Sequence, residues 1–138
     1  GDENLYIAVD PSPVKSSGVA KIIRGKSNEP RVSQEIERIL GSKKLDLVLS
    51  DMAPNITGVR IVDDSASREL AEEALNAAFS FLAPGGRMVA KLFQGSEAQS
   101  FVAETKKCFL KTVLFKPAAS RSESREIFVV ADGFKAGR

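Results

Sequence analysis

Charged residues that stand beside or inside apolar runs are the strongest chemical signal in this sequence. Asp10 and Asp51 directly follow such runs, Lys91 lies inside one, and Glu126 directly precedes one. Burying an unpaired charge costs free energy, so a charge within a strand is unusual unless it is paired or used. In open α/β sheets the strand ends are also where ligands bind. These four residues are therefore the candidates for acid–base or substrate-positioning chemistry.

The sequence contains no histidine and a single cysteine, Cys108. Ser-His nucleophiles, imidazole zinc sites and cysteine metal clusters are thereby excluded for this chain, and no metal site is predicted. Any proton transfer must use Asp, Glu, Lys or Tyr6. A lone cysteine also fits a reducing, intracellular setting, with cytoplasm, nucleolus and mitochondrion all left open.

Lys91 allows two interpretations. A lysine near a strand end can extend its charge to solvent along an apolar stem, which needs no function. Alternatively, desolvation at the sheet edge lowers its pKa and makes it a base, while a nearby carboxylate favours the charged form. The functional interpretation is favoured, because Lys91 is flanked on both sides by apolar residues.

Asp51 opens a segment that continues with Met52, Pro54 and Asn55. An Asp after a strand is as often a turn former as a functional residue. Here its neighbours offer a rigid, partly apolar rim and an amide, which suit a planar or polar ligand. The carboxylate with its rim is therefore a candidate binding segment.

Arg121 and Arg125 precede Glu126 in a polar stretch, and guanidinium groups match phosphate geometry. A solvated charge cluster is the alternative, and it is the interpretation adopted for Glu123. The net charge of +2 does not by itself indicate a nucleic-acid partner, although residues 111–138 hold six basic residues against three acidic ones. Asp10 could bind ribose hydroxyls or simply form an Asp-Pro turn.

Length and composition indicate one globular domain over residues 1–138, with 43% hydrophobic and 28% charged residues. No apolar run approaches the ~20 residues of a transmembrane helix, and no signal peptide is visible, so no membrane partner is expected.

Hydrophobic periodicity predicts strands alternating with helices. The expected strands are residues 5–9, 19–23, 45–50, 87–93, 112–115 and 127–131; the expected helices are 32–40, 65–82 and 96–109, with a loop over 51–64. Gly41 is expected to end the first helix, Pro84-Gly85-Gly86 to form a turn after the second, and Ser96 to Gln99 to form a capping box for the third. This order predicts an α/β fold with a mostly parallel sheet sandwiched by helices and an antiparallel edge pair from the last two strands. That ending resembles a Rossmann-like methyltransferase sheet, although the pattern alone would suit other doubly wound folds.

Three motifs together resemble the FtsJ/RrmJ family of ribosomal RNA 2′-O-ribose methyltransferases. They are Ser50-Asp51-Met52-Ala53-Pro54-Asn55, Lys91-Leu92-Phe93-Gln94-Gly95, and Ser120-Arg121 with Ser124-Arg125-Glu126. The likeness runs over nearly the whole chain. It implies S-adenosylmethionine as cofactor and RNA, either ribosomal RNA or a ribosomal subunit, as partner.

The resemblance also implies roles for single residues. Asp51, Lys91 and Glu126 match the Asp, second Lys and Glu of the family's Lys-Asp-Lys-Glu tetrad, so Lys91 would activate or orient the ribose hydroxyl. Cofactor contacts would come from Asp10, Asp51, Met52 and Pro54, and RNA contacts from Asn55, Arg121 and Arg125.

This chain departs from the family pattern at its beginning, because it starts at the family's second strand. It lacks a match to the first tetrad Lys and to the glycine-rich loop that cradles the cofactor, and Arg24-Gly25-Lys26-Ser27 offers no acidic cofactor contact. The first central strand is expected to be missing, between the strands at 5–9 and 45–50. An upstream segment, a partner chain or re-pairing of the strands must then satisfy the exposed backbone groups. The chain alone is expected to bind little or no S-adenosylmethionine.

Two other functions stay open. One is a non-catalytic, methyltransferase-like module for RNA binding or ribosome assembly, which the lack of a glycine-rich loop favours and the matched Asp51, Lys91 and Glu126 disfavour. The other is an unrelated Rossmann-like enzyme for small molecules, which would not bind RNA at low salt.

Overall fold

The computed structural model describes residues 6–10, 20–24, 28–117 and 125–135, and the chain divides into two compact units, residues 1–43 and 44–138. Each unit has its own sheet. The single domain expected over residues 1–138 stays a prediction.

In the first unit, β1 (Tyr6–Asp10) and β2 (Ala20–Arg24) form a two-stranded parallel sheet. Both strands lie one residue later than predicted. Their register places Asp10, the last residue of β1, opposite Arg24.

α1 (Pro30–Leu40) follows in the same unit. Its proline stands at the helix start, where the missing N–H has no helical partner to lose. Val32, Ile36 and Leu40 recur at helical spacing and are buried, and Gly41 ends the helix with a φ of +61° that suits glycine. The predicted helix and its glycine end are confirmed.

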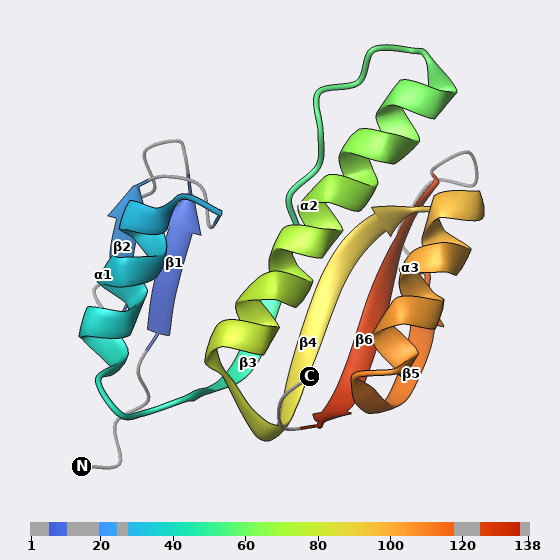
Figure 1. The fold of residues 1–138 in the computed structure, drawn as a ribbon. Coiled ribbons are helices and arrows are strands. Elements are labelled where there is room, and N and C mark those ends of the chain that lie inside the picture. Colours follow the sequence, from blue (N-terminus) through green and yellow to red (C-terminus); the bar gives the residue numbers. More distant parts are fainter. Residues whose placement is uncertain (1–5, 11–19, 25–27, 118–124, 136–138) are drawn as a thin grey trace. The chain divides into compact units, whose positions relative to one another are not determined.

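The second unit contains a four-stranded sheet in the order β3-β4-β6-β5 (Figure 1). Its strands are β3 (Leu45–Ser50), β4 (Leu82–Phe93), β5 (Phe109–Phe115) and β6 (Glu126–Phe134). β3 and β4 are parallel, whereas β6 runs antiparallel to both β4 and β5. The predicted α/β class and the antiparallel pairing of the last two strands are confirmed, with β6 inserted between β4 and β5.

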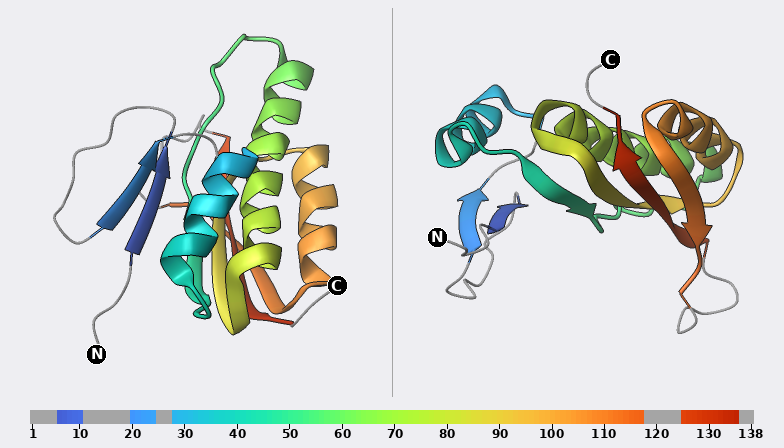
Figure 2. Two further views of the ribbon diagram at one scale, coloured as in Figure 1. Left: turned by 60° about the vertical axis from the view of Figure 1, so that its left-hand side comes forward. Right: turned by 90° about the horizontal axis from the view of Figure 1, so that it is seen from below.

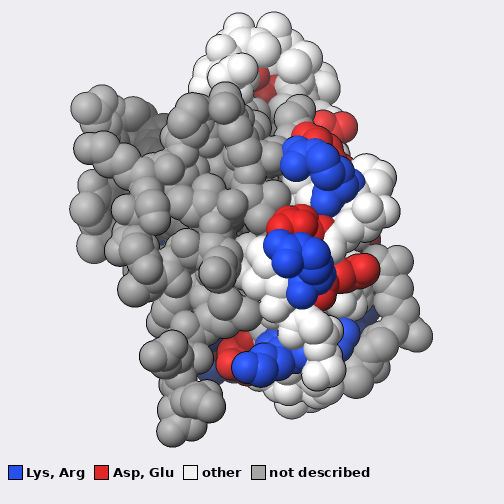
Figure 3. Space-filling view, turned by 90° about the vertical axis from the view of Figure 1, so that its left-hand side faces the viewer, with Lys and Arg blue, Asp and Glu red and all other residues white. Residues whose placement is uncertain are grey.

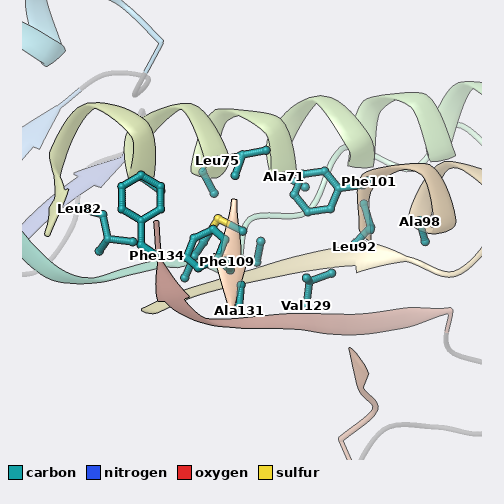
Figure 4. Packing of buried hydrophobic residues seen from close by; sticks show 14 of the residues in the cluster. Ala71, Leu75, Leu82, Leu92, Ala98, Phe101, Phe109, Val129, Ala131 and Phe134 are labelled. Carbon is teal, nitrogen blue, oxygen red and sulfur yellow. The ribbon is translucent and has the colours of Figure 1, made fainter. Parts of the chain in front are cut away.

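α2 (Arg60–Phe81) and α3 (Ser96–Lys106) lie on the same face of this sheet (Figure 2). Because side chains alternate along a strand, every second residue of β4 and β6 faces the helices. These residues and the helix residues above them form one apolar core (Figure 4), whose members include Ala71, Leu75, Met88, Ala90, Leu92, Phe101, Phe109, Val129, Ala131 and Phe134. Within this unit the sheet is thus covered by helices on one face, rather than on both as predicted.

Element boundaries around α2 and α3 also differ from the prediction. α2 begins at Arg60 instead of residue 65, so Asp63 and Asp64 are helical rather than part of a loop. α3 ends at Lys106, and Phe109, predicted on the helix, opens β5 and is buried there. Apolar spacing alone could not separate the helix end from the strand start.

The expected capping box and glycine turn are also different in the structure. Gly95 is the N-cap of α3, and no side chain caps that helix end, so Ser96 does not act as predicted. Pro84-Gly85-Gly86 lies within β4, where the pairing with β3 shifts register between Leu45 and Leu47. A φ of +85° at Gly85 permits this bulge-like irregularity.

β3 is an end strand of its sheet, and among the described strands its outer edge has no partner. β1 and β2 do not pair with it. The strand expected to be missing between those at 5–9 and 45–50 stays a prediction. No helix in the described part of the chain combines the length and hydropathy needed to cross a membrane.

Candidate functional site

Lys91 and Glu126 lie close together at one end of the four-stranded sheet. The antiparallel register of β4 and β6 pairs Lys91 with Phe128 and Phe93 with Glu126. The Lys91 Nζ atom is 3.8 Å from Glu126 Oε2 and 5.9 Å from the centre of the Phe128 ring. The Lys91 side chain is 19% exposed and that of Glu126 40% exposed. The pair is accessible to a ligand while partly removed from water.

Asp51 comes from the strand on the other side of β4. The parallel register pairs Ser50, the last residue of β3, with Ala90 of β4, so Asp51 directly follows the last pair on one strand and Lys91 on the other. Asp51 is exposed, and no ion pair within 4.0 Å joins it to Lys91 in the described part of the chain. The sheet therefore brings Lys91 of β4 into contact with Glu126 of β6, while Asp51 follows the other neighbouring strand, β3.

The segment after Asp51 is anchored at its far end by Asp63. In that segment Met52 and Pro54 are partly buried and Asn55 is exposed. The buried Asp63 carboxylate accepts hydrogen bonds from the Thr57 amide (2.9 Å), the Thr57 hydroxyl (2.7 Å) and the Gly58 amide (3.1 Å). The Thr57 hydroxyl bond is the largest cause of a lowered pKa at Asp63, followed by the Thr57 amide bond.

The predicted RNA-binding arginines are placed differently. Arg125 Nη1 lies 2.6 Å from Asp64 Oδ1, and its guanidinium carbon lies 5.1 Å from the centre of the Phe93 ring. Arg121 is outside the described residues. The phosphate contacts of both remain predictions.

Asp10 belongs to the first unit, whose position relative to the second is not described. Only its backbone is described, at the end of β1. Its cofactor contact likewise remains a prediction.

Sequence reasoning missed three residues of α2 that support this edge of the sheet: Asp63, Asp64 and Ser67. Buried Ser67 accepts a hydrogen bond from the Phe93 amide at 2.9 Å. A signal was available, because Asp63 and Ser67 continue the buried stripe of Ala71 at a spacing of four. Polar residues on a buried helix face usually have a specific hydrogen-bonding partner.

A hollow of about 340 Å³ adjoins the end of β4 and the start of α3, lined in part by Gln94, Gln99, Leu114 and Ile127.

On the face in Figure 3, basic and acidic side chains of the described residues are interspersed rather than gathered into a patch of one sign. The described residues hold no group of three or more His, Cys, Asp or Glu side chains suited to a metal ion.

Comparison with known proteins gives consistent matches. The sequence model of FtsJ-like methyltransferases matches residues 2–134. Ribosomal RNA large subunit methyltransferase E of Stutzerimonas stutzeri (strain A1501) is 38% identical over 135 residues, covering 98% of this chain and 66% of that protein. The protein of the same name from Coxiella burnetii (strain CbuK_Q154) is 40% identical, covering 97% of this chain and 65% of that protein. The chain thus spans slightly less than two thirds of the length of these relatives.

Solved structures give the same picture. A Plasmodium falciparum protein named as a ribosomal RNA methyltransferase superposes with a TM-score of 0.85 at 27% identity, over 96% of this chain and 73% of that chain. Human methyltransferase-like protein 13, crystallised with SAH, shares the fold at a TM-score of 0.60 and 14% identity, over 91% of this chain and 60% of that chain. The matched motifs, the Rossmann-like fold and the match over residues 2–134 show that this chain belongs to the FtsJ-like methyltransferase family.

Proposed function

We propose that this chain carries the catalytic residues of an S-adenosylmethionine-dependent methyltransferase that modifies a ribose 2′-hydroxyl of RNA, with ribosomal RNA as substrate. One observation carries the proposal: in a member of the FtsJ-like family, Lys91 of β4 lies 3.8 Å from Glu126, the first residue of β6, and the neighbouring strand β3 is followed directly by Asp51. The names of the relatives support the substrate class.

The residues around this edge suit the cofactor. Met52 and Pro54 offer partly buried apolar surface beside the exposed carboxylate of Asp51, which fits a ligand with a planar apolar part and polar groups. The same fold holds SAH in human methyltransferase-like protein 13. Bound S-adenosylmethionine would supply an electrophilic methyl group, with Asp10, Asp51, Met52 and Pro54 as the proposed contacts.

Within this proposal the protein contributes mainly positioning. Lys91 Nζ contacts the acceptor hydroxyl and orients it or accepts its proton, while Glu126 and Asp51 position Lys91 and tune its charge. Orienting two reactants can supply much of a rate enhancement without a histidine base. Asn55, Arg121 and Arg125 are the proposed RNA contacts, with ribosomal RNA or the ribosomal subunit as partner.

Replacing the lysine tests this assignment. Lys91→Ala in the complete protein should reduce methyl transfer to ribosomal subunits at least 100-fold, because general acid–base and positioning groups each contribute roughly that much. RNA binding should change little. Transfer is measured with radiolabelled S-adenosylmethionine, and ribose modification is identified by resistance of the product to alkaline cleavage.

Lys107→Ala is the matched control, since Lys107 is exposed at the end of α3. Near-normal turnover by Lys91→Ala would rule out its assigned role. RNA binding without transfer by the wild-type protein would instead favour the non-catalytic RNA-binding module.

A further inference from the structure

An ion pair joins α2 to the start of β6, directly beside the proposed catalytic pair. Arg125 Nη1 donates to Asp64 Oδ1 at 2.6 Å, and the guanidinium lies over the Phe93 ring. The Gln94 amide donates to the Arg125 carbonyl at 2.8 Å, while Arg125 Nη1 lies 3.5 Å from the Gln94 carbonyl. These four residues, Asp64, Phe93, Gln94 and Arg125, are here called the Asp64–Arg125 clamp.

The ion pair within the clamp is partly shielded from solvent. The side chains of Asp64 and Arg125 are 14% and 29% exposed. Removing one partner of a partly buried ion pair leaves the other charge uncompensated, so breaking this pair costs more free energy than breaking a surface pair. A comparison exists on the same two strands: Arg87 and Asp132 pair across β4 and β6 at 2.5 Å, with exposures of 55% and 39%.

The clamp controls the residue that follows it. Arg125 immediately precedes Glu126, and Glu126 is paired in register with Phe93. At 3.8 Å the Lys91–Glu126 contact is beyond hydrogen-bonding distance, so it depends on the placement of both backbones. Two residues of α2 anchor the two strands near Lys91 and Glu126. Ser67 accepts a hydrogen bond from the Phe93 amide of β4, and Asp64 accepts one from Arg125, the residue before β6.

We propose that Arg125 and Asp64 are positioning residues, which set the distance between Glu126 and Lys91 and so the orientation of the acceptor hydroxyl. The inference rests on the proposed function. It assigns Arg125 an internal role in place of a phosphate contact, because its guanidinium is already engaged by a carboxylate and covers an aromatic ring.

The kinetic test compares Asp64→Asn and Arg125→Gln with the control Asp132→Asn in the complete protein. The first two should lower kcat for methyl transfer roughly 10- to 100-fold, as expected for a shift of about 1 Å at the reacting groups. KM for RNA and for S-adenosylmethionine should stay within about threefold, and Asp132→Asn should leave kcat within about twofold, as expected for an exposed pair. Equal loss in all three variants, or unchanged kcat in Asp64→Asn, would overturn the proposal.

Salt dependence separates positioning from phosphate binding. If Arg125 only positions Glu126, Arg125→Gln and Asp64→Asn should bind RNA with the wild-type salt slope. If Arg125 contacts a phosphate, Arg125→Gln should weaken RNA binding and reduce the slope by about 0.7 to 0.9, while Asp64→Asn should not. The second pattern would overturn the inference.

The double variant Asp64→Arg with Arg125→Asp tests whether a loss of activity comes from the broken ion pair or from misfolding. If the ion pair positions Glu126, the double variant should have a kcat at least tenfold higher than Arg125→Asp alone. No recovery, in a protein with wild-type urea unfolding, contradicts it.

A second measurement does not depend on transfer activity. The NMR chemical shift of the Lys91 side chain should change with Glu126→Gln in the wild-type background and change much less in the Asp64→Asn background. An equal response in both backgrounds would overturn the positioning role of Asp64 and Arg125. A clear difference between the backgrounds, in a protein that does not transfer methyl groups, would support that positioning role and reject only the proposed function.

Discussion

Lys91 shows how a strand can carry a lysine in an apolar setting. Its side chain is only 19% exposed, and two features replace part of its hydration: the Glu126 carboxylate at 3.8 Å and the face of the Phe128 ring at 5.9 Å. A carboxylate and an aromatic face both stabilise an ammonium group. Such a site holds a polar group in place yet leaves one side open to a ligand.

At the same scale, Gly95 is a position where only glycine fits. Its φ of +147° and ψ of −170° lie in a region that side chains avoid, and an added Cβ would come within 3.3 Å of Asp64 Oδ2. Gly95→Ala should therefore destabilise the protein by about 1 to 3 kcal/mol in urea unfolding and should also disturb the Asp64–Arg125 clamp.

Ser96→Ala is the control for Gly95→Ala. No side chain caps α3, so this change should cost less than about 0.5 kcal/mol. A loss near 1 kcal/mol at Ser96 would show that the serine caps the helix after all.

At the scale of elements, the first turns of α2 contact every segment around the site. Hydrogen bonds are accepted by Asp63 from Thr57 in the preceding loop, by Asp64 from Arg125, and by Ser67 from the Phe93 amide. Further along the helix, Arg68 ties α2 to α3 through Glu104 at 2.6 Å and lies over the Phe101 ring. One helix thus connects the segment after β3, the end of β4, the start of β6 and α3.

The hydrogen bonds that Asp63 accepts from Thr57 and Gly58 predict a specific pH dependence of the stability of the fold. The pKa of Asp63 is lowered in the folded protein, first by the Thr57 hydroxyl bond, so its carboxylate stabilises the fold above the unfolded-state pKa. That stabilisation is lost as the pH falls from the unfolded value of about 3.9 through the lower folded value. Urea midpoints measured from about pH 6 down to about pH 2 should show this loss in the wild type and a smaller one in Asp63→Asn.

Asp46 provides the comparison, because it is an exposed aspartate on β3. Asp46→Asn should keep the wild-type acid dependence. An unchanged acid dependence in Asp63→Asn would mean that the Thr57 bonds do not contribute to stability through the charged form.

At the scale of the whole molecule, the two sheets are the main feature. β1 and β2 form a sheet of their own, and β3 ends the other with an outer edge that has no partner among the described strands. Leu47 and Leu49 of β3 are 49% and 63% exposed. The chain also spans less than two thirds of the length of its first relatives.

Weak cofactor binding by the 138-residue chain alone is predicted from its sequence. The chain has no match to the glycine-rich loop that cradles the cofactor in the family, and without that loop fewer backbone groups can contact S-adenosylmethionine. Calorimetric titration should give no saturable binding of S-adenosylmethionine below about 100 μM, a range where binding free energies are weaker than about −5.5 kcal/mol. Saturation at micromolar concentration would contradict the prediction.

The local elements could be predicted well because their signals are local. The strand at 45–50, the helix ending at Gly41 and the apolar stripe of α2 follow from side-chain periodicity and from glycine at a helix end. Family membership was likewise available from three short motifs, because their residue types, order and spacing together match the family, whose model covers residues 2–134. The α2 start was predicted wrongly because Asp63 accepts a hydrogen bond from Thr57, six residues earlier, which apolar spacing does not reveal. The α3 end was predicted wrongly because the burial of Phe109 in β5 depends on tertiary structure.

The sequence by itself determined which residues could do chemistry: with no histidine and one cysteine, only carboxylates, lysines and a tyrosine remained. It could not determine which of them meet. Glu126 stands 35 residues after Lys91 in the chain, and their proximity depends on β6 entering between β4 and β5 in an antiparallel register. The partner of Arg125 was also decided only by tertiary structure, because Asp64 comes from a helix 61 residues earlier. Side-chain chemistry is encoded residue by residue, whereas distances between charges are set by strand order, register and helix packing.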